Sequence, residues 1–343
     1  MSQSRRSFMG SLLALPLASL SGRGLAQADA PRPIRLNIPG PGAMPFTPIE
    51  LVHKLGIDRA LGAELLIRYF PSGVQGIEDM LAGNADFAGL GFVVLPRMQA
   101  KGQDVVAIAP LSGSTPPFSV VARTPLRGKV RSLADLKGRS VGVPIGSAKS
   151  KTYMQSMAEM MLASGGVQAD QVRWVGTGQN VEGLFGALAG EVVDAVFCEE
   201  PFSSALVRRG VGFVLADLRD ARLASSVPGA GHLRAVVATR GALVTQDPQR
   251  VALMVQILQR ALAWMHQQKP EAIIGRLDIA DERDRHDRIA ALKNSPHMFP
   301  PDTRFSRAQV EATRAFLRAG GDTAAESFDP SRVVVDTWAG SLP

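Results

Sequence analysis

The residues best suited to chemistry in this chain lie in short polar or glycine-rich turns that follow apolar, strand-like runs. In open α/β sheets, small molecules bind at the carboxyl ends of strands, where helix N-termini present backbone N–H groups. Glycine permits close backbone approach, and hydroxyl and amide side chains add hydrogen bonds. The turns therefore predict non-covalent capture of a small molecule. The candidate ligand-binding residues are Gly42, Met44, Phe46, Ser72, Gly73, Gly91, Phe92, Ser114, Thr115, Gly146, Ser147, Thr177, Asn180 and Glu200.

These candidates differ in the contact that each would make. Met44 and Phe46 would line an apolar wall. Gly146 and Ser147 precede a helix expected over 149–163, which makes this turn the best candidate for an anion. Asn180 is either a helix cap or a ligand contact, and each turn taken alone is also compatible with an ordinary loop.

A carboxylate pair adds an opposite charge to the candidate site. Glu199 and Glu200 follow an apolar strand at 195–198. We expect one to face solvent, and Glu200 to face the cleft, where it would pair with a ligand amine or an arginine.

No pattern of catalytic or metal-binding residues accompanies the turns. None of the five histidines has metal-ligand spacing with another His, Cys or acid, and GxSxG, P-loop and dinucleotide motifs are absent. Cys198 is the only cysteine, so no internal disulfide can form, and it is interpreted as a small buried side chain. We therefore predict no enzyme activity, no cofactor and no metal.

The elements that must position these turns alternate along the chain. Apolar strands separated by helical segments predict an α/β fold with mainly parallel sheets. A second series of such units begins after residue 122, and the region after 239 is mostly helical, with a 3.6-residue apolar period from Val251 to Met265. Strands are expected at 34–38, 63–70, 85–90, 105–111, 118–122, 140–143, 172–175, 195–198, 212–215 and 233–239.

The N-terminus has the pattern of a cleaved export signal. Arg5 and Arg6 form a twin-arginine pair, an apolar run of about ten residues follows, and Ala26-Gln27-Ala28 fits the small-x-small cleavage rule. The sequence therefore predicts a twin-arginine signal peptide over residues 1–28 and a periplasmic protein. Its removal lowers the net charge from +7 to +4, and the remaining basic residues are scattered, which argues against nucleic acid as a partner.

Several motifs, in order and spacing, resemble one family over nearly all of the mature chain. They are residues 69–100 around Tyr69-Phe-Pro-Ser-Gly-Val-Gln-Gly-Ile-Glu-Asp-Met-Leu-Ala-Gly-Asn-Ala-Asp-Phe87, Ser132-Leu-Ala-Asp-Leu-Lys-Gly138, Val141-Gly-Val-Pro-Ile-Gly-Ser147, Ala187-Leu-Ala-Gly-Glu-Val-Val-Asp-Ala195 with Glu200-Pro201, and Ala261-Leu-Ala-Trp264. The chain is similar to substrate-binding proteins of nitrate, sulfonate and taurine ABC importers, a group that includes pyrimidine-precursor-binding proteins related to thiamine biosynthesis.

The resemblance implies the type II periplasmic-binding-protein fold: two α/β lobes, an interlobe cleft and two crossover segments. Lobe one would comprise 31–122 plus 228–343, and lobe two 123–227. It also implies a monomeric receptor that captures a small anion or zwitterion, such as a sulfonate, taurine or nitrate, by hinge closure and delivers it to the permease of an ABC importer. Two alternatives stay open: a binder of a neutral heteroaromatic such as a pyrimidine precursor, and an enzyme on the same fold, of the pyrimidine synthase or desulfinase type.

Overall fold

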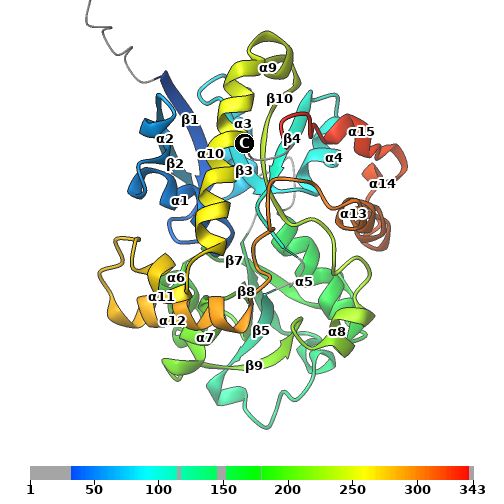
Figure 1. Cartoon of the computed structure of the whole chain (residues 1–343). Helices are drawn as coiled ribbons and strands as arrows, with labels where there is room; N and C mark the ends of the chain where they lie inside the picture. The colour runs from blue at the N-terminus through cyan, green and yellow to red at the C-terminus, as the bar shows by residue number, and fades with distance from the viewer. Residues whose placement is uncertain (1–31, 114–116, 145–151, 179, 340–343) are drawn as a thin grey trace, which may run out of the picture. The chain divides into compact units, whose positions relative to one another are not determined.

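Two five-stranded sheets organise the chain (Figure 1). The computed structural model describes residues 32–113, 117–144, 152–178 and 180–339. The predicted signal peptide therefore lies outside the described residues. Each sheet, with the helices that cover it, forms one lobe of the molecule. Within the described residues, no helix is both long enough and apolar enough to cross a membrane.

The first sheet combines N-terminal strands with one strand from the second half of the chain. Its order is β2-β1-β3-β10-β4. β1 pairs in parallel with β2 and β3, whereas β10 runs antiparallel to both β3 and β4. Its strands are β1 (Arg32–Pro39), β2 (Ala63–Phe70), β3 (Phe87–Gly91), β4 (Val105–Pro110) and β10 (Ala235–Arg240).

The second sheet repeats this arrangement. Its order is β7-β6-β8-β5-β9, with β6 parallel to β7 and β8 and with β5 antiparallel to β8 and β9. Its strands are β5 (Phe118–Arg123), β6 (Ser140–Val143), β7 (Arg173–Gly176), β8 (Ala195–Glu199) and β9 (Gly212–Asp217).

The strands that follow the two crossovers correct one sequence prediction and refine another. β5 belongs to the second sheet, so the first crossover lies between Pro110 and Phe118 and not at residue 122. Both sheets are mixed, because β5 and β10 each enter a new sheet from the neighbouring lobe and run against its parallel strands. The second crossover lies between Asp217 and Ala235, which brackets the expected return at residue 228.

The helices cover both sheets. The helices before the first crossover are η1 (Met44–Phe46), α1 (Thr47–Lys54), α2 (Ile57–Ala60), α3 (Gly73–Leu81) and α4 (Val94–Gln99). Those of the second lobe are η2 (Thr124–Leu126), η3 (Leu133–Leu136), α5 (Tyr153–Ser164), η4 (Ala169–Gln171), α6 (Val181–Ala189), α7 (Phe202–Arg208) and α8 (Ala221–Ser226). The C-terminal helices are α9 (Gly241–Gln246), α10 (Pro248–His266), α11 (Pro270–Ile274), α12 (Glu282–Asn294), α13 (Arg307–Ala319), α14 (Ala324–Ser327) and α15 (Pro330–Val333).

The C-terminal region confirms the predicted apolar period but not its assignment to the first lobe alone. α10 buries Val251, Met254, Val255 and Leu258 in the core that also contains β1. α12 contacts both lobes: its Ala291 and Leu292 share a hydrophobic cluster with Leu51 of α1, and it also packs against α7 of the second lobe (Figure 1). Its mixed-charge run is helical as expected but only partly exposed, because Asp287 forms a bidentate ion pair with Arg208 of α7.

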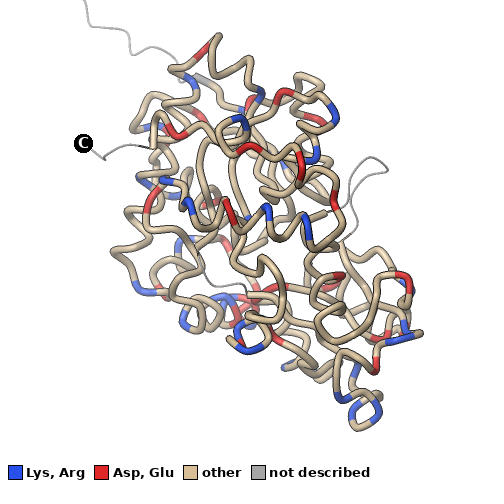
Figure 2. Tube along the Cα trace, turned by 90° about the vertical axis from the view of Figure 1, so that its right-hand side faces the viewer, with Lys and Arg blue, Asp and Glu red and all other residues tan. Residues whose placement is uncertain are grey.

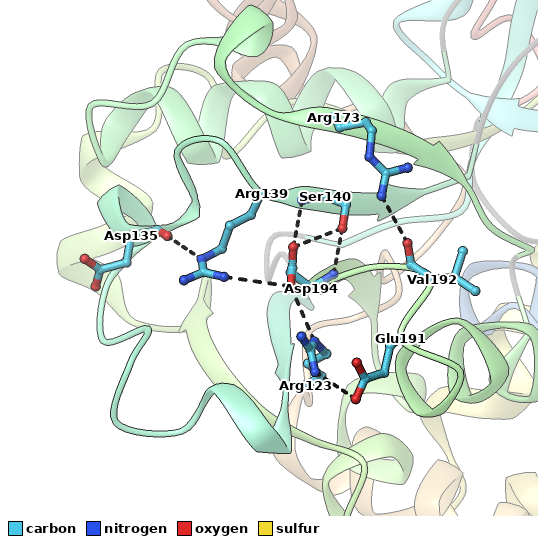
Figure 3. Close-up of polar contacts among 8 residues, drawn as sticks. All are labelled: Arg123, Asp135, Arg139, Ser140, Arg173, Glu191, Val192 and Asp194. Atoms are coloured by element: carbon cyan, nitrogen blue, oxygen red, sulfur yellow. Dashed lines mark hydrogen bonds and ion pairs between the residues drawn. The ribbon is translucent and has the colours of Figure 1, made fainter.

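One aspartate fixes the start of an inner strand in each lobe. The carboxylate of Asp194, just before β8, accepts hydrogen bonds from the backbone N–H and hydroxyl of Ser140 at 3.0 and 3.1 Å, and Arg123 contacts it at 3.4 Å (Figure 3). Burial alone would raise the pKa of Asp194, but these hydrogen bonds outweigh it and lower that pKa. Asp86 does the same before β3, accepting from the backbone N–H of Arg35 at 2.8 Å. Both networks lie at the amino ends of the strands, so they anchor the sheets and leave the carboxyl ends for a ligand.

Candidate functional site

A small cavity lies at the carboxyl ends of strands from both sheets. Its volume is about 20 Å³, the space of a single water molecule. Pro39, Phe46, Ser72, Gly73, Val74, Gly91 and Val94 line it from the first lobe, and Thr152, Tyr153, Met154 and Glu199 line it from the second. A smaller space of about 10 Å³ adjoins it, sharing Met154 and Glu199. We call these two spaces together the inner cavity.

Two helices begin at the wall of the inner cavity. Ser72 caps α3, where its hydroxyl oxygen accepts from the N–H of Gln75 at 3.3 Å. Thr152 caps α5, accepting from the N–H of Gln155 at 3.0 Å and donating to the carbonyl of Pro144 at 2.7 Å. Since helix N-termini carry partial positive charge, both ends favour a negatively charged group nearby.

Gly91 of the first lobe lies in close contact with Tyr153 of the second lobe at this cavity. A Cβ atom at position 91 would lie 2.7 Å from Cγ and 2.9 Å from Cβ of Tyr153. Tyr153 also packs edge-to-face on Phe118, with ring centroids 6.0 Å apart. The first residue of α5 therefore rests directly on the backbone of β3, and only glycine fits beneath it.

Glu199 places a carboxylate at the inner cavity. The residue is 2% exposed, and its Oε2 has no hydrogen-bond partner among the described residues. Burial raises the pKa of Glu199 to about 8, against the opposing effect of the Arg234 charge. Arg234 is also buried, and its burial lowers its pKa to about 10. Its guanidinium donates to the carbonyl of Gly113 at 2.8 Å.

Glu200, which the sequence analysis assigned to the cleft, does not line the inner cavity. Its carboxylate accepts from the hydroxyl of Ser204 at 2.9 Å and pairs with Arg219 at 3.1 Å. Consecutive residues at the end of an extended strand point to opposite sides, so only one of the two carboxylates can face the cavity. The expectation that the other faces solvent is also wrong, since Glu199 and Glu200 are 2% and 1% exposed.

Apart from Gly42 and Asn180, the other sequence candidates fall into four groups. Phe46, Ser72, Gly73 and Gly91 line the inner cavity. Met44 and Phe92 are packed in hydrophobic cores instead, Phe92 edge-to-face on Phe328. The described residues place Thr177 beside β6, where its N–H donates to the carbonyl of Val143 at 2.9 Å. Ser114, Thr115, Gly146 and Ser147 lie outside the described residues.

Gly42 and Asn180 line a second, larger space, which we call the outer cavity. Its volume is about 510 Å³, and it also contacts Glu50, Phe202 and Arg288. Gly42 has a left-handed backbone (φ 83°) and donates its N–H to Glu50 at 3.0 Å. Asn180 caps α6 by accepting from the N–H of Gly183 at 2.8 Å, so the cap interpretation is correct. Phe202 lines both the outer cavity and the inner one.

Sequence reasoning missed Thr152 and Tyr153 as site residues because it began the helix at 149. The spacing of Thr152 and Gln155 is a capping pattern that would have moved the start of the helix to 153. Glu199 was recognised as part of the pair, but no sequence signal showed which carboxylate turns inward.

Cys198, which lines the inner cavity, and His232 are two further buried titratable groups. Burial, reinforced by Glu200 and Glu199, raises the pKa of the Cys198 thiol well above its ordinary value, which disfavours the reactive thiolate. Burial lowers the pKa of His232 to about 3, and its ring stacks on Phe316 at 4.2 Å. Among the described residues, no group of three or more His, Cys, Asp or Glu side chains could hold a metal.

Comparison with known proteins identifies the family. A sequence profile described as NMT1/THI5 like matches residues 64–272. The chain belongs to this family. The comparison with curated proteins returned no significant match.

Solved structures establish the fold. A protein from Bordetella bronchiseptica RB50 matches with a TM-score of 0.78 and 21% identity, over 91% of this chain and 96% of that one. The alkanesulfonate-binding protein SsuA from Xanthomonas axonopodis pv. citri matches with a TM-score of 0.66 and 18% identity, over 85% and 94%. The nitrate-binding protein NrtA from Synechocystis PCC 6803 matches with 0.65 and 12%, over 88% and 86%. The chain therefore has the periplasmic-binding-protein fold predicted from the sequence, with two α/β lobes.

Proposed function

We propose that this protein is an exported receptor that captures a small anion or zwitterion between its lobes and delivers it to the permease of an ABC importer. The observation that carries the proposal is the inner cavity, which both lobes line at the carboxyl ends of their strands. Helix N-termini of α3 and α5 would attract the negative group of the solute. Two proteins of the same fold are described as alkanesulfonate-binding and nitrate-binding, which supports a small-molecule ligand.

Capture would proceed by rotation of the lobes about the two crossovers. A cavity of about 20 Å³ is smaller than any such solute, so entry requires opening. Arg97 of α4 donates to the hydroxyl of Ser156 on α5 at 2.8 Å, a contact between the lobes that opening would break. The sheet memberships support lobe boundaries at the crossovers.

A binding role is favoured over catalysis because the inner cavity contains no activated nucleophile among the described residues. Cys198, the cysteine that could act as a nucleophile, is buried with a raised pKa. A neutral heteroaromatic is the second candidate ligand, because Phe46 and Tyr153 line the cavity from different lobes and would contact its ring.

The receptor function is tested by thermal shift and calorimetry with the purified protein. Nitrate, ethanesulfonate, taurine, β-alanine and 4-amino-2-methylpyrimidine form the panel. We expect at least one anion or zwitterion to raise the melting temperature, because ligand bound only to the folded state stabilises it by mass action. A shift produced by the pyrimidine alone would favour the second candidate, and no shift with any compound would contradict the receptor proposal.

Export by the twin-arginine route is proposed from Arg5 and Arg6. We expect the wild-type chain in the periplasmic fraction of fractionated cells. Replacement of both arginines by lysine should retain the chain in the cytoplasm. Export that persists in this variant would contradict the assigned route but not the binding function.

A further inference from the structure

The strongest unexplained feature of the site is the carboxylate of Glu199. It lies at the end of β8, is 2% exposed and lines both parts of the inner cavity. Its Oε2 has no hydrogen-bond partner among the described residues. Since buried polar groups are normally hydrogen-bonded, an acceptor left open toward a cavity indicates a donor that arrives with the ligand.

The charged groups around Glu199 have other contacts. Arg234, near the start of β10, donates to the carbonyl of Gly113. Glu200, on the other side of the chain, is paired with Arg219 and Ser204. The other titratable groups around Glu199 are Tyr153 of α5 and the thiol of Cys198. Burial raises the pKa of both. Glu199 is therefore the acidic group that this cavity offers to a solute.

Resting on the receptor function proposed above, we propose that Glu199 makes the site selective for a solute with a cationic amine nitrogen, which the carboxylate binds within the inner cavity. A simple anion such as nitrate or an alkylsulfonate brings no donor to Oε2 and no positive charge to stabilise the ionised form of Glu199. The helix N-termini of α3 and α5 remain available for a negative group of the same solute.

Proton release would accompany this binding. With a pKa of about 8, Glu199 carries a proton at pH 7 before the solute arrives. An ammonium group beside it favours the carboxylate, so the proton passes to the buffer as the ion pair forms. A neutral heteroaromatic would instead pair with the protonated acid and release no proton.

Matched pairs of solutes test the inference on the wild-type protein. Taurine and ethanesulfonate differ by the amine alone, as do β-alanine and propionate. We expect the amine-bearing member of a pair to bind at least about tenfold more tightly at pH 7, because hydrogen bonds to charged groups are the strong ones. Calorimetry in phosphate and in Tris should give different binding enthalpies for the amine-bearing solute, in proportion to the protons released.

The variant Glu199→Gln keeps the shape of the side chain and removes its charge. We expect it to lose about tenfold or more in affinity for the amine-bearing solute and to discriminate between the members of a pair less than about twofold. Glu200→Gln is the matched control: it makes the same chemical change one residue away, outside the inner cavity, and should retain wild-type selectivity.

Two results overturn different claims. Binding of ethanesulfonate or propionate as tightly as the amine-bearing partner, by a wild-type protein that does bind, would refute selectivity by Glu199 and leave the receptor function standing. Absence of binding by every compound would refute the receptor function itself. The comparison of solute pairs on the wild-type protein does not depend on whether either variant folds.

Discussion

Replacement of Gly91 by alanine is expected to weaken solute binding by about tenfold while both lobes stay folded. The added methyl would lie 2.7 Å from Cγ and 2.9 Å from Cβ of Tyr153. Rotation of the ring cannot relieve a contact with Cβ, so β3 and α5 must separate. Overpacking of this kind costs about 1–3 kcal/mol, and about 1.4 kcal/mol against the closed state lowers the apparent affinity tenfold.

The matched variant Gly89→Ala, on the same strand, distinguishes opening of the lobes from a loss of stability. At Gly89 a Cβ atom would lie 2.7 Å from Cε1 of Phe46 and 2.9 Å from Cγ2 of Ile38, both within the first lobe. Gly89→Ala should therefore lower the melting temperature, because its crowding cannot be relieved by lobe movement. Gly91→Ala should lower it less and should increase the radius of gyration in X-ray scattering. Equal radii for Gly91→Ala and the wild type would contradict the role assigned to Gly91.

Local sequence patterns predicted the elements well because each pattern reflects a local interaction. The capping side chains of Ser72, Asn180 and Asp247 all accept backbone hydrogen bonds at the starts of helices. The apolar period from Val251 is the buried face of α10. The direction of β5 and β10 was not predictable from such patterns, since it depends on where a crossover re-enters a sheet.

The candidate site was located by topology better than by residue type. The rule that ligands bind at strand carboxyl ends found Phe46, Ser72, Gly73 and Gly91, which share the inner cavity. The rule failed at positions where the direction of the side chain determines whether it reaches the cavity. The side chain of Met44 packs in a hydrophobic core. Glu199, and not Glu200, lines the inner cavity, because these two neighbours at the end of β8 point to opposite sides. Those directions are set by contacts distant in sequence.

Charge distribution agrees with a small-molecule partner. Figure 2 shows Lys and Arg interspersed with Asp and Glu along the described chain. Two arginines have local acidic partners: Arg219 pairs with Asp217 and Glu200, and Arg288 at the outer cavity pairs with Asp284. Pairing of this kind neutralises these charges locally.

Replacement of Glu199 by glutamine is expected to stabilise the protein at alkaline pH. The pKa of Glu199 is raised from 4.5 to about 8 on folding. The folded state therefore holds a proton more tightly than the unfolded state between these values. The stability contributed by this group is full below pH 4.5 and is lost, at about 1.4 kcal/mol per pH unit, as the pH rises through 8. The variant should gain about 5 kcal/mol over the wild type at pH 9 by this linkage.

Urea unfolding of both proteins at pH 5, 6, 7, 8 and 9 measures this gain. The difference between variant and wild type isolates Glu199 from His232, whose lowered pKa acts in the opposite direction and below pH 6.5. A difference that does not grow with pH would contradict a buried, unpaired carboxylate.

If an amine-bearing solute supplies the missing charge, its stabilising effect on the wild type should be larger at pH 9 than at pH 6. The ion pair with the solute amine would thus offset the energetic cost of ionising Glu199 in the empty site.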